Sequence, residues 1–396
     1  MFHSIVRIIE IVAVFGTVSS SIYYLLCLWS AAAFLRERKS ADRSVRNTQF
    51  LPPVSILKPL KGTDPEIYDC FRSHCLQDYP EYEIIFGVSD PNDPAVERVR
   101  QLQREFPHRE VRLVICRETL GANVKVSNLA QMLSDARYEH LIVNDSDIRV
   151  QPDYLYKVIA PLANEKVGMV TCLYRGEAAA PLGSRLESLG ISTDFCAGVL
   201  VARQLEGDIR FGLGSTLAFR RRDLDRIGGF ESFVDYLADD YELGKRIADL
   251  GLSVELAHLV VVTHLPAYTL RGFLAHQLRW ARGVRDSRPG GYLGLVFTFG
   301  LLWSCLAVIV SQGSRWAWSL LALAFVLRFA VATVVGRKVL RDRKLVRHLW
   351  LLPIRDLIAV GVWIVSLGGR TVTWRGDRFQ LKGGKLSRIG PESNCD

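Results

Sequence analysis

The sequence has no CxxC pair and no cysteine–histidine group at zinc-site spacing, although it contains eight cysteines among 396 residues. This absence excludes the common structural zinc sites. Cys70 and Cys75 could close only a small loop, so no disulfide framework is expected. We predict that the cysteines are reduced thiols of a cytosolic or membrane protein.

Acidic residues are outnumbered, with 41 Asp and Glu against 50 Lys and Arg, which gives a net charge of +9. Apolar residues make up 49% of the chain and charged residues 23%. This mixture is more typical of a membrane-associated protein with a basic cytosolic surface than of a soluble enzyme. Because much of the positive charge flanks apolar segments, we expect a membrane partner and no nucleic acid.

Little positive charge precedes the first apolar run. Residues 11–35 are uncharged and mostly apolar, which is about the length needed to cross a bilayer. Arg7 alone provides positive charge before this run, whereas Arg36, Arg38 and Lys39 follow it. A cleaved signal peptide carries its charge in front. We therefore predict an uncleaved anchor within residues 1–48 that leaves the following domain in the cytosol.

Residues 49–268 are predicted to form one α/β domain. Helical stretches at 64–76 and 94–106 alternate with short apolar strands, which favours a Rossmann-like, mostly parallel sheet. The expected strands are 54–60, 82–90, 111–117, 140–145 and 166–174. Ligands of such sheets bind beyond the carboxyl ends of the strands, where Asp90 and Asp145 fall.

Apolar segments return near the carboxyl terminus and predict a multi-pass membrane protein. These segments are residues 292–310, 316–335 and 349–367. The basic loop 336–348 is expected in the cytosol. Arg355 and Asp356 lie inside the last segment, so either a true span or a re-entrant or interfacial segment fits it. Residues 368–396 are predicted to be a basic tail on the cytosolic side.

Asp145 and Asp147 flank Ser146 directly after a buried strand. Carboxylates at this spacing can hold one hard divalent cation, such as Mg²⁺ or Mn²⁺, directly or through water. Such a cation would neutralise a diphosphate and stabilise it as a leaving group. The alternative is a solvated turn in which Asp147 acts as a cap.

Three polar residues follow earlier strand ends. The Asp90 carboxylate can accept hydrogen bonds from a base or a ribose, or it can form an Asp-Pro turn. Lys125 and Asn128 follow a turn glycine in "GANVKVSNL". The lysine could pair with a phosphate, and the alternative is an ordinary solvated helix start.

A second acidic cluster, Asp239 and Asp240, begins a predicted helix in "LADDYELGKRIADLG". The helix dipole alone would favour acidic residues there. The functional interpretation makes one carboxylate a general base, which takes the proton from an acceptor hydroxyl as its oxygen attacks.

Residues 269–291 alternate arginines with large apolar side chains in "RGFLAHQLRWARGVRDSR". This pattern predicts an amphipathic helix that lies at a membrane interface. Arg279 could contact a diphosphate and Trp280 could form a wall of an acceptor pocket. A purely membrane-surface role is the alternative.

The order of these motifs resembles the inverting, membrane-bound GT-A glycosyltransferases: an early Asp, then DxD, then (D/E)D, then (Q/R)xxRW. The segments "SILKPLKGTDP", "GVSDPNDPA", "NDSDIRV" and "TVTWRGDRFQLKGG" are similar to the ceramide glucosyltransferase family. The similarity extends over residues 54–384. It includes the bacterial branch of hopanoid-biosynthesis glycosyltransferases.

The resemblance implies a GT-A fold and transfer of a hexose, expected to be glucose, from a UDP-sugar to a lipid hydroxyl with inversion. Ceramide is the expected acceptor, and the alternative is transfer of N-acetylglucosamine to a hopanoid polyol. A processive polysaccharide synthase would need more spans than the three or four expected here. A non-catalytic membrane adaptor is a further alternative.

The resemblance also implies roles for single residues. Asp240 would be the base, Asp90 would bind the uridine, and Asp145 with Asp147 would hold the metal and diphosphate. The other residues expected to bind the nucleotide-sugar are Lys125, Asn128, Asp239, His276, Arg279 and Trp280. His276 departs from the pattern, because Gln or Arg is usual there, and its expected role is a hydrogen bond to phosphate.

Overall fold

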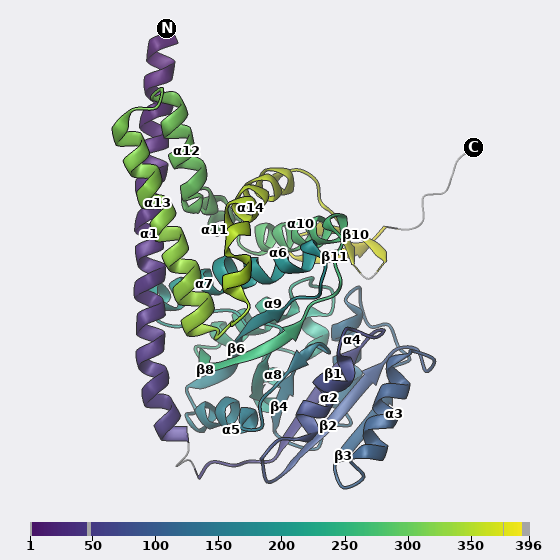
Figure 1. Ribbon diagram of the computed structural model, residues 1–396. Helices are drawn as coiled ribbons and strands as arrows, with labels where there is room; N and C mark the ends of the chain where they lie inside the picture. Colours follow the sequence, from purple (N-terminus) through teal and green to yellow (C-terminus); the bar gives the residue numbers. More distant parts are fainter. Residues whose placement is uncertain (1, 46–48, 375, 390–396) are drawn as a thin grey trace, which may run out of the picture. The chain divides into compact units, whose positions relative to one another are not determined.

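The computed structural model describes residues 2–45, 49–374 and 376–389 (Figure 1). The chain divides into two compact units, here called the sheet unit and the helical unit. The sheet unit comprises Glu37–Ala179, Leu205–Ala267 and Thr371–Asp396. The helical unit comprises Met1–Arg36, Ala180–Gln204 and Tyr268–Arg370.

An eight-stranded sheet forms the centre of the sheet unit, in the order β3-β2-β1-β4-β7-β6-β8-β5. Its strands are β1 Val54–Leu60, β2 Tyr82–Val88, β3 Glu110–Ile115, β4 His140–Val143, β5 Ile148–Arg149, β6 Val167–Glu177, β7 Leu217–Arg220 and β8 Ser253–His264. Strands β3, β2, β1 and β4 are parallel neighbours, and β7 is antiparallel to both β4 and β6. The prediction of a mostly parallel sheet is confirmed, and β5, β7 and β8 were not foreseen.

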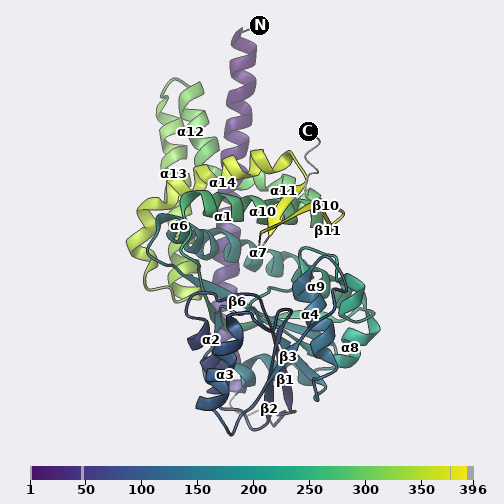
Figure 2. The ribbon, with the colours of Figure 1, turned by 90° about the vertical axis from the view of Figure 1, so that its right-hand side faces the viewer.

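Helices cover both faces of the parallel strands. Figure 2 shows α2 and α3 on one side and α4 and α9 on the other. The helices of this unit are α2 Ile67–Cys75, α3 Ala95–Glu105, α4 Val124–Leu133, α5 Tyr154–Ile159, α8 Arg221–Arg226 and α9 Asp239–Asp249. All seven residues of β1 and of β2 are buried, as expected for strands that are covered on both faces.

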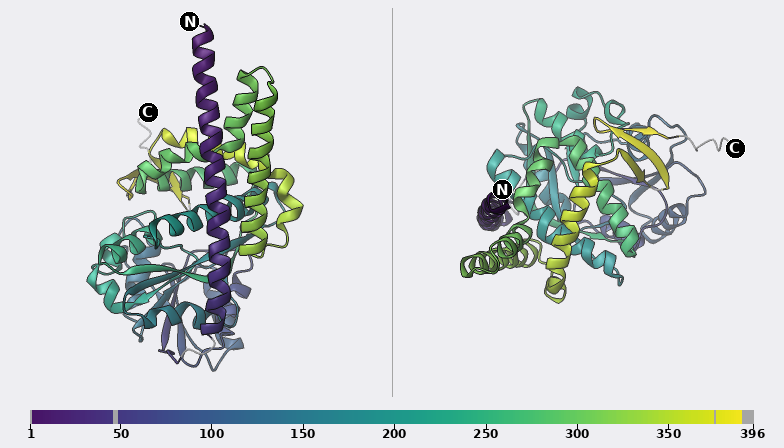
Figure 3. Two further views of the ribbon diagram at one scale, coloured as in Figure 1. Left: turned by 90° about the vertical axis from the view of Figure 1, so that its left-hand side faces the viewer. Right: turned by 90° about the horizontal axis from the view of Figure 1, so that it is seen from above.

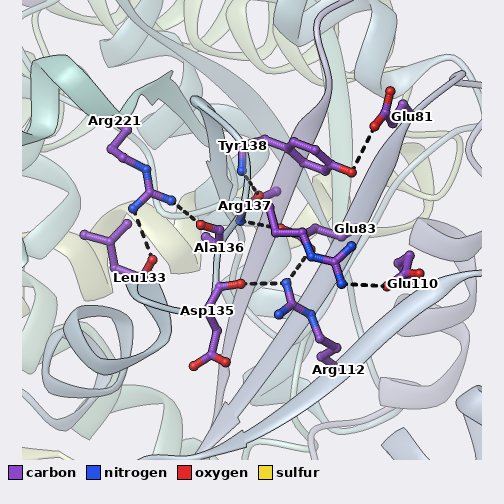
Figure 4. Close-up of polar contacts among 11 residues, drawn as sticks. Glu81, Glu83, Glu110, Arg112, Leu133, Asp135, Ala136, Arg137, Tyr138 and Arg221 are labelled. Carbon is purple, nitrogen blue, oxygen red and sulfur yellow. Dashed lines mark hydrogen bonds and ion pairs between the residues drawn. The ribbon is translucent and has the colours of Figure 1, made fainter.

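The amino-terminal edge of the sheet contains a buried charge network centred on Glu83 of β2 (Figure 4). One carboxylate oxygen accepts hydrogen bonds from Ser55 Oγ at 2.6 Å and from the Arg137 amide at 2.8 Å. The other oxygen accepts from Arg112, whose guanidinium also donates to the Asp135 carbonyl at 2.6 Å. These bonds tie β1, β2, β3 and the entry to β4 together, so this network is structural.

The helical unit contains the apolar segments. Its main helices are α1 Phe2–Val45, α6 Leu182–Gly190, α7 Cys196–Glu206, α10 Leu270–Ser287, α11 Pro289–Gly294, α12 Gly300–Val310, α13 Arg315–Thr333 and α14 Leu352–Leu367. Among the described residues, three helices are long and apolar enough to cross a membrane: His3–Ser40, Arg315–Val339 and Leu345–Leu367. A fourth crossing results if Pro289–Thr298 and Gly300–Val310, which are bent by 50°, form one broken span.

Small residues allow close helix packing in this unit. A Cβ atom on Gly16 of α1 would lie 2.3 Å from the Trp303 ring of α12. Ala13, Ala307 and Ala317 form a buried cluster shared by α1, α12 and α13. In the view from above in Figure 3, α1 is seen nearly end-on, whereas α14 lies across the view.

The charges predicted within the last apolar segment face protein groups. Arg328 of α13 is almost fully buried and donates to Asp356 of α14 at 2.7 Å and to Asp194 at 2.6 Å. Arg355 donates to Gln277 of α10 at 2.8 Å. Both residues thus have polar partners within the helical unit, as is usual for charged groups in apolar helices.

Residues predicted to be a basic tail include a small antiparallel sheet: β9 Thr371–Trp374, β10 Asp377–Lys382 and β11 Lys385–Arg388. This C-terminal sheet belongs to the sheet unit, whereas residues 180–204 of the predicted α/β domain belong to the helical unit. The strands were not foreseen because apolar residues alternate with polar and charged ones along them, and the positive charge of the segment obscures that period of two. The seven described cysteines are free, and Cys395 lies outside the described residues.

Candidate active site at the carboxyl edge of the sheet

The turn that carries Asp145 and Asp147 is anchored by a buried amide. Strand β4 ends at Val143, and the next residue, Asn144, donates to the Ser215 carbonyl at 2.6 Å and to the Tyr154 hydroxyl at 2.9 Å. The Asp145 amide then donates to the Gly214 carbonyl at 3.3 Å. The turn is therefore fixed against the chain that leads into β7.

Gly214 joins the two acidic motifs. Its amide donates to Asp240 Oδ2 at 2.9 Å, while its carbonyl accepts from the Asp145 amide. A Cβ atom on Gly214 would lie 2.8 Å from Asp145 Oδ2 and 3.5 Å from Asp240 Oδ2. The absence of a side chain here lets the two carboxylates approach one backbone unit from both sides.

Lys125, near the start of α4, bridges the same two motifs. Its Nζ atom lies 2.8 Å from Asp145 Oδ1 and 2.8 Å from Asp239 Oδ2. Burial lowers the pKa of Lys125, but the carboxylates of Asp145, Asp239 and Asp240 outweigh burial and hold the pKa above its ordinary value. The structure thus brings Lys125, Asp145, Asp239 and Asp240 together, although more than 90 residues separate the two acidic pairs in the chain.

Asp147 lies beside strand β8. It accepts a hydrogen bond from the Thr263 hydroxyl of that strand. Burial and the neighbouring charges of Asp145 and Asp64 together raise the pKa of Asp147 to about 7. Asp64 accepts from the Ser146 hydroxyl between the two acids.

Lys58 and Asp64 were not predicted as site residues. Lys58 of β1 is fully buried, and its Nζ atom donates to the Asp145 carbonyl at 3.0 Å. Burial lowers its pKa to about 8, with Cys70, Asp147 and Asp145 opposing that shift. A lysine inside the otherwise apolar strand "VSILKPL" was the available indication, because a fully buried lysine needs a partner.

Asp240 has the properties of a proton acceptor near neutral pH. Burial and the neighbouring charge of Asp239 together raise the pKa of Asp240 to about 6, although Lys125 acts against them. A carboxyl group with such a pKa is ionised at pH 7 and is also a stronger base than an ordinary aspartate.

Asp90 and Asn128 lie at the end of β2 and on α4. The Asp90 carboxylate is exposed and accepts from the Asn92 amide at 2.8 Å, which is the Asp-Pro turn considered as the alternative. Its neighbour Ser89 donates to Asn128 Oδ1 at 2.9 Å. The structure thus connects this strand end to the helix that carries Lys125, and a role in nucleotide binding stays a prediction.

The donor set suits a cation that arrives with a diphosphate. No group of three or more His, Cys, Asp or Glu side chains within residues 2–45, 49–374 and 376–389 is arranged to hold a metal ion. Two hard carboxylates, Asp145 and Asp147, are present, and the Asp145 side chain is 42% exposed. Mg²⁺ is usually bound in this way, by one or two carboxylates together with substrate phosphates and water.

The helical unit carries the other predicted residues on α10. His276 stacks on Tyr268 with ring centroids 5.2 Å apart, and its centroid lies 5.1 Å from that of Trp280. His276 Nδ1 is 3.4 Å from Oε1 of the buried Glu187. Arg279 lies one residue before Trp280 on the same helix. The roles of His276, Arg279 and Trp280 stay predictions.

Gln277, next to the position that departs from the motif, has a structural role. It donates to Glu187 Oε2 at 2.8 Å and accepts from Arg355 Nη2 at 2.8 Å. These bonds join α10 to α6 and α14. Gln277 is therefore occupied within the helical unit and does not replace the missing Gln or Arg at position 276.

Two of the α10 arginines hold the end of α14. Arg282 donates to the Gly368 carbonyl at 3.3 Å, and Arg285 donates to the Ser366 and Gly369 carbonyls, the latter at 3.0 Å. Cationic groups at a helix carboxyl terminus satisfy its free carbonyls and its dipole. These arginines therefore have an intramolecular structural role in addition to any membrane contact.

The sequence profile of glycosyl transferase family 21 matches residues 12–387. The chain belongs to this family. It is 25% identical over 397 residues to ceramide glucosyltransferase 1 of Caenorhabditis elegans, across 97% of this chain and 83% of that protein. It is 38% identical over 115 residues to a ceramide glucosyltransferase of Komagataella phaffii, across 27% of this chain and 23% of that one.

A solved structure shows the same fold. Mannosyltransferase PcManGT from Pyrobaculum calidifontis, in complex with GDP-Man and Mn²⁺, superposes with a TM-score of 0.50 at 20% identity, across 87% of this chain and 99% of that one. The predicted GT-A-like fold, the predicted enzyme class of hexosyltransferase and the resemblance to ceramide glucosyltransferases are confirmed for this member of family 21.

Proposed function

We propose that this family 21 enzyme transfers a hexose, glucose in the first instance, from a UDP-sugar to the hydroxyl group of a membrane lipid, with inversion. The observation that carries the proposal is the meeting of Asp145, Lys125, Asp239 and Asp240 around Gly214. The relatives named ceramide glucosyltransferase support ceramide as the acceptor.

Asp240 is the proposed general base. Its carboxylate takes the proton from the acceptor O–H as the oxygen attacks the anomeric carbon of the sugar. The new glycosidic C–O bond forms on the face opposite the breaking bond to the diphosphate, so the configuration inverts and UDP leaves. The Gly214 amide holds one Asp240 oxygen, which orients the carboxylate.

Lys125 and the DxD pair are proposed to bind the diphosphate. Asp145 and Asp147 would hold a divalent cation, which neutralises the diphosphate charge when it is bound. The Lys125 ammonium, held between Asp145 and Asp239, supplies a fixed positive charge. Asp90 and Asn128 are proposed to bind the nucleoside, and His276, Arg279 and Trp280 to complete the site for donor and acceptor.

We infer three membrane crossings, with the sheet unit in the cytosol. The chain leaves the sheet unit after Ala267 and returns to it at Thr371. Because β9–β11 must lie on the same side of the membrane as the rest of that unit, the chain between these residues crosses an even number of times. The broken helix 289–310 and α13 supply two crossings, so α14 is assigned as an interfacial helix, in keeping with its transverse course in Figure 3.

The test is lipid mass spectrometry of a ceramide-containing host that expresses the wild-type chain or D240N. A new hexosylceramide with the wild type, absent with D240N, is the expected result. A product built on a hopanoid in a hopanoid-containing host, with none on ceramide, would replace the acceptor assignment. Equal product from both variants would contradict the assignment of the base.

A further inference from the structure

Residues 234–238, here called the connecting segment, lead directly into Asp239 and are hydrogen-bonded on one side to the start of α4. The Ala122 amide donates to Asp235 Oδ1 at 2.8 Å, and the Asn123 side chain donates to the Tyr236 carbonyl at 2.7 Å. Asn123 is also the N-cap residue of α4, since its Oδ1 accepts from an amide of the first turn at 3.3 Å. The helix that carries Lys125 and the segment that carries the second acidic pair are therefore joined.

The C-terminal sheet binds the other side of the connecting segment. The Leu237 amide donates to the Gly384 carbonyl at 3.0 Å, and the Leu386 amide donates to the Asp235 carbonyl at 2.7 Å. These are backbone bonds of the kind that join strands, although about 150 residues of chain separate the two partners. The connecting segment thus lies between α4 and the β10–β11 hairpin.

Apolar contacts accompany these hydrogen bonds. The C-terminal sheet has one buried face, which packs against Ala122 and Leu237. Its buried side chains are Val372, Phe379, Leu381 and Leu386. A sheet of three short strands has little stability of its own unless its apolar face is covered. The C-terminal sheet is therefore stabilised by the connecting segment, which leads into Asp239, and by the start of α4, which carries Lys125.

We propose that the C-terminal sheet is a positioning element for the active site, which acts through the connecting segment to hold Lys125, Asp239 and Asp240 in their bridged arrangement. This inference rests on the proposed role of Asp240 for its catalytic consequence, but the mechanical link is independent of that role. Tyr236 and Gly384 are the positioning residues. Neither is proposed to touch the substrate.

The hairpin turn offers a matched pair of glycines. Gly384 has φ +79°, and a Cβ atom there would lie 3.1 Å from Tyr236 Cδ1. Gly383 has φ +59°, but a Cβ atom there would have no neighbour within 4 Å. Both substitutions to alanine strain a left-handed backbone. Only the change at Gly384 also pushes on the connecting segment.

The experiment compares G384A with G383A in the full-length protein in detergent micelles. For G384A we expect kcat to fall by about 10- to 100-fold with KM for the UDP-sugar within about twofold, because small displacements of catalytic groups reduce rate more than binding. Hydrogen exchange should become faster at residues 121–125 and 235–241 in G384A and remain at the wild-type rate there in G383A. Equal loss of kcat in both variants, or faster exchange confined to residues 377–388, would overturn the proposal.

Tyr236 supplies a second test if G384A does not fold. The Tyr236 ring lies 5.4 Å from Lys385 Nζ and 5.6 Å from the Arg246 guanidinium. Y236A should reproduce the loss of kcat and the faster exchange, whereas Y236F keeps the ring and should restore both. Wild-type protein without transferase activity would refute the proposed function, while the exchange data would still decide whether the sheet is coupled to α4 and α9.

Discussion

The two edges of the parallel sheet carry charge networks of opposite design. At the amino edge, both oxygens of Glu83 accept hydrogen bonds, and its side chain is fully buried. At the carboxyl edge, Asp145 shares a single lysine with Asp239, and its side chain is 42% exposed. Both networks consist of carboxylates and basic side chains. They differ in how fully the hydrogen-bonding capacity of the carboxylates is used.

The balance of charge also differs between the two edges. Two arginines, Arg112 and Arg137, lie against the single carboxylate of Glu83. At the other edge, two aspartate pairs gather around the ammonium groups of Lys125 and Lys58. Negative charge in excess at a partly exposed site attracts a cation, whereas a saturated buried carboxylate has no capacity left for a ligand.

Saturation of the hydrogen-bonding groups, rather than residue type, separates the structural network from the functional one. Removing a member of the amino-edge network should therefore cost stability and leave chemistry intact. Removing a member of the carboxyl-edge site should cost chemistry and leave stability nearly intact.

The largest expected effect is that of D240N on turnover. Loss of the general base should lower kcat by about 1,000-fold, with unfolding temperature equal to or above that of the wild type. D249N is the matched control, because Asp249 lies at the other end of α9 in an exposed pair with Arg210 and should keep wild-type activity. A D240N enzyme with more than a tenth of wild-type kcat would contradict the assignment of catalysis to the carboxyl edge of the sheet.

E83A should produce the reverse pattern. Removing the carboxylate leaves Arg112 and Arg137 close together without their shared partner, and we expect a loss of about 3 kcal/mol in the free energy of unfolding. The kcat of the folded fraction should stay at the wild-type value. E97A, in an exposed pair with Arg104, is the control and should leave thermal unfolding unchanged. Loss of kcat in folded E83A protein would show that the amino edge also serves catalysis.

G214A should lower the activity of the carboxyl-edge site by a steric effect alone. The added methyl group would press on the carboxylate of Asp145, and we expect kcat to fall by about 100-fold. Steady-state kinetics would be compared with those of G361A. A Cβ atom on Gly361 meets nothing within 4 Å, and Gly361 has no positive φ, so that variant reports the effect of alanine at a glycine without a collision. Equal kinetics for the two variants would show that the crowding at Gly214 is harmless.

A smaller effect is expected in the pH dependence of stability. Burial and the charge of Asp239 raise the pKa of Asp240 to about 6, from an ordinary value of 3.8. The unfolded chain therefore releases this proton first as the pH rises, and the folded state should lose about 1–2 kcal/mol between pH 4 and pH 6. Over the same range activity should rise as the base ionises. Thermal unfolding without divalent cations should show this loss in the wild type but not in D240N, and equal slopes would contradict the shifted pKa.

Much of the fold could be predicted because its strands are short apolar runs separated by helical stretches. β1 and β2 are buried on both faces, so their composition alone identifies them. The C-terminal strands could not be recognised in the same way, since their buried apolar residues stand one at a time between polar or charged ones. Their partners, Ala122 and Leu237, are far away in the sequence.

The candidate site could be predicted in part for a similar reason. Asp145 and Asp240 stand at motif positions, and the resemblance brought them into one hypothesis. The bridge through Lys125 and the role of Gly214 depend on the antiparallel β7, which places residues 214–216 beside the end of β4. No local pattern encodes that pairing. Lys58 was overlooked because a single lysine in an apolar strand does not indicate what its Nζ atom contacts.

The most direct test of the carboxyl-edge site is calorimetric binding of UDP-glucose with and without Mn²⁺ to the wild type, D240N and D145N. Binding to the wild type and D240N should be equal and should require the cation, while the turnover of D240N should be about 1,000-fold slower. D145N should lose the cation-dependent part of binding. Cation-independent binding that is unchanged in D145N, or turnover in D240N at the wild-type rate, would contradict the assignment of these acids.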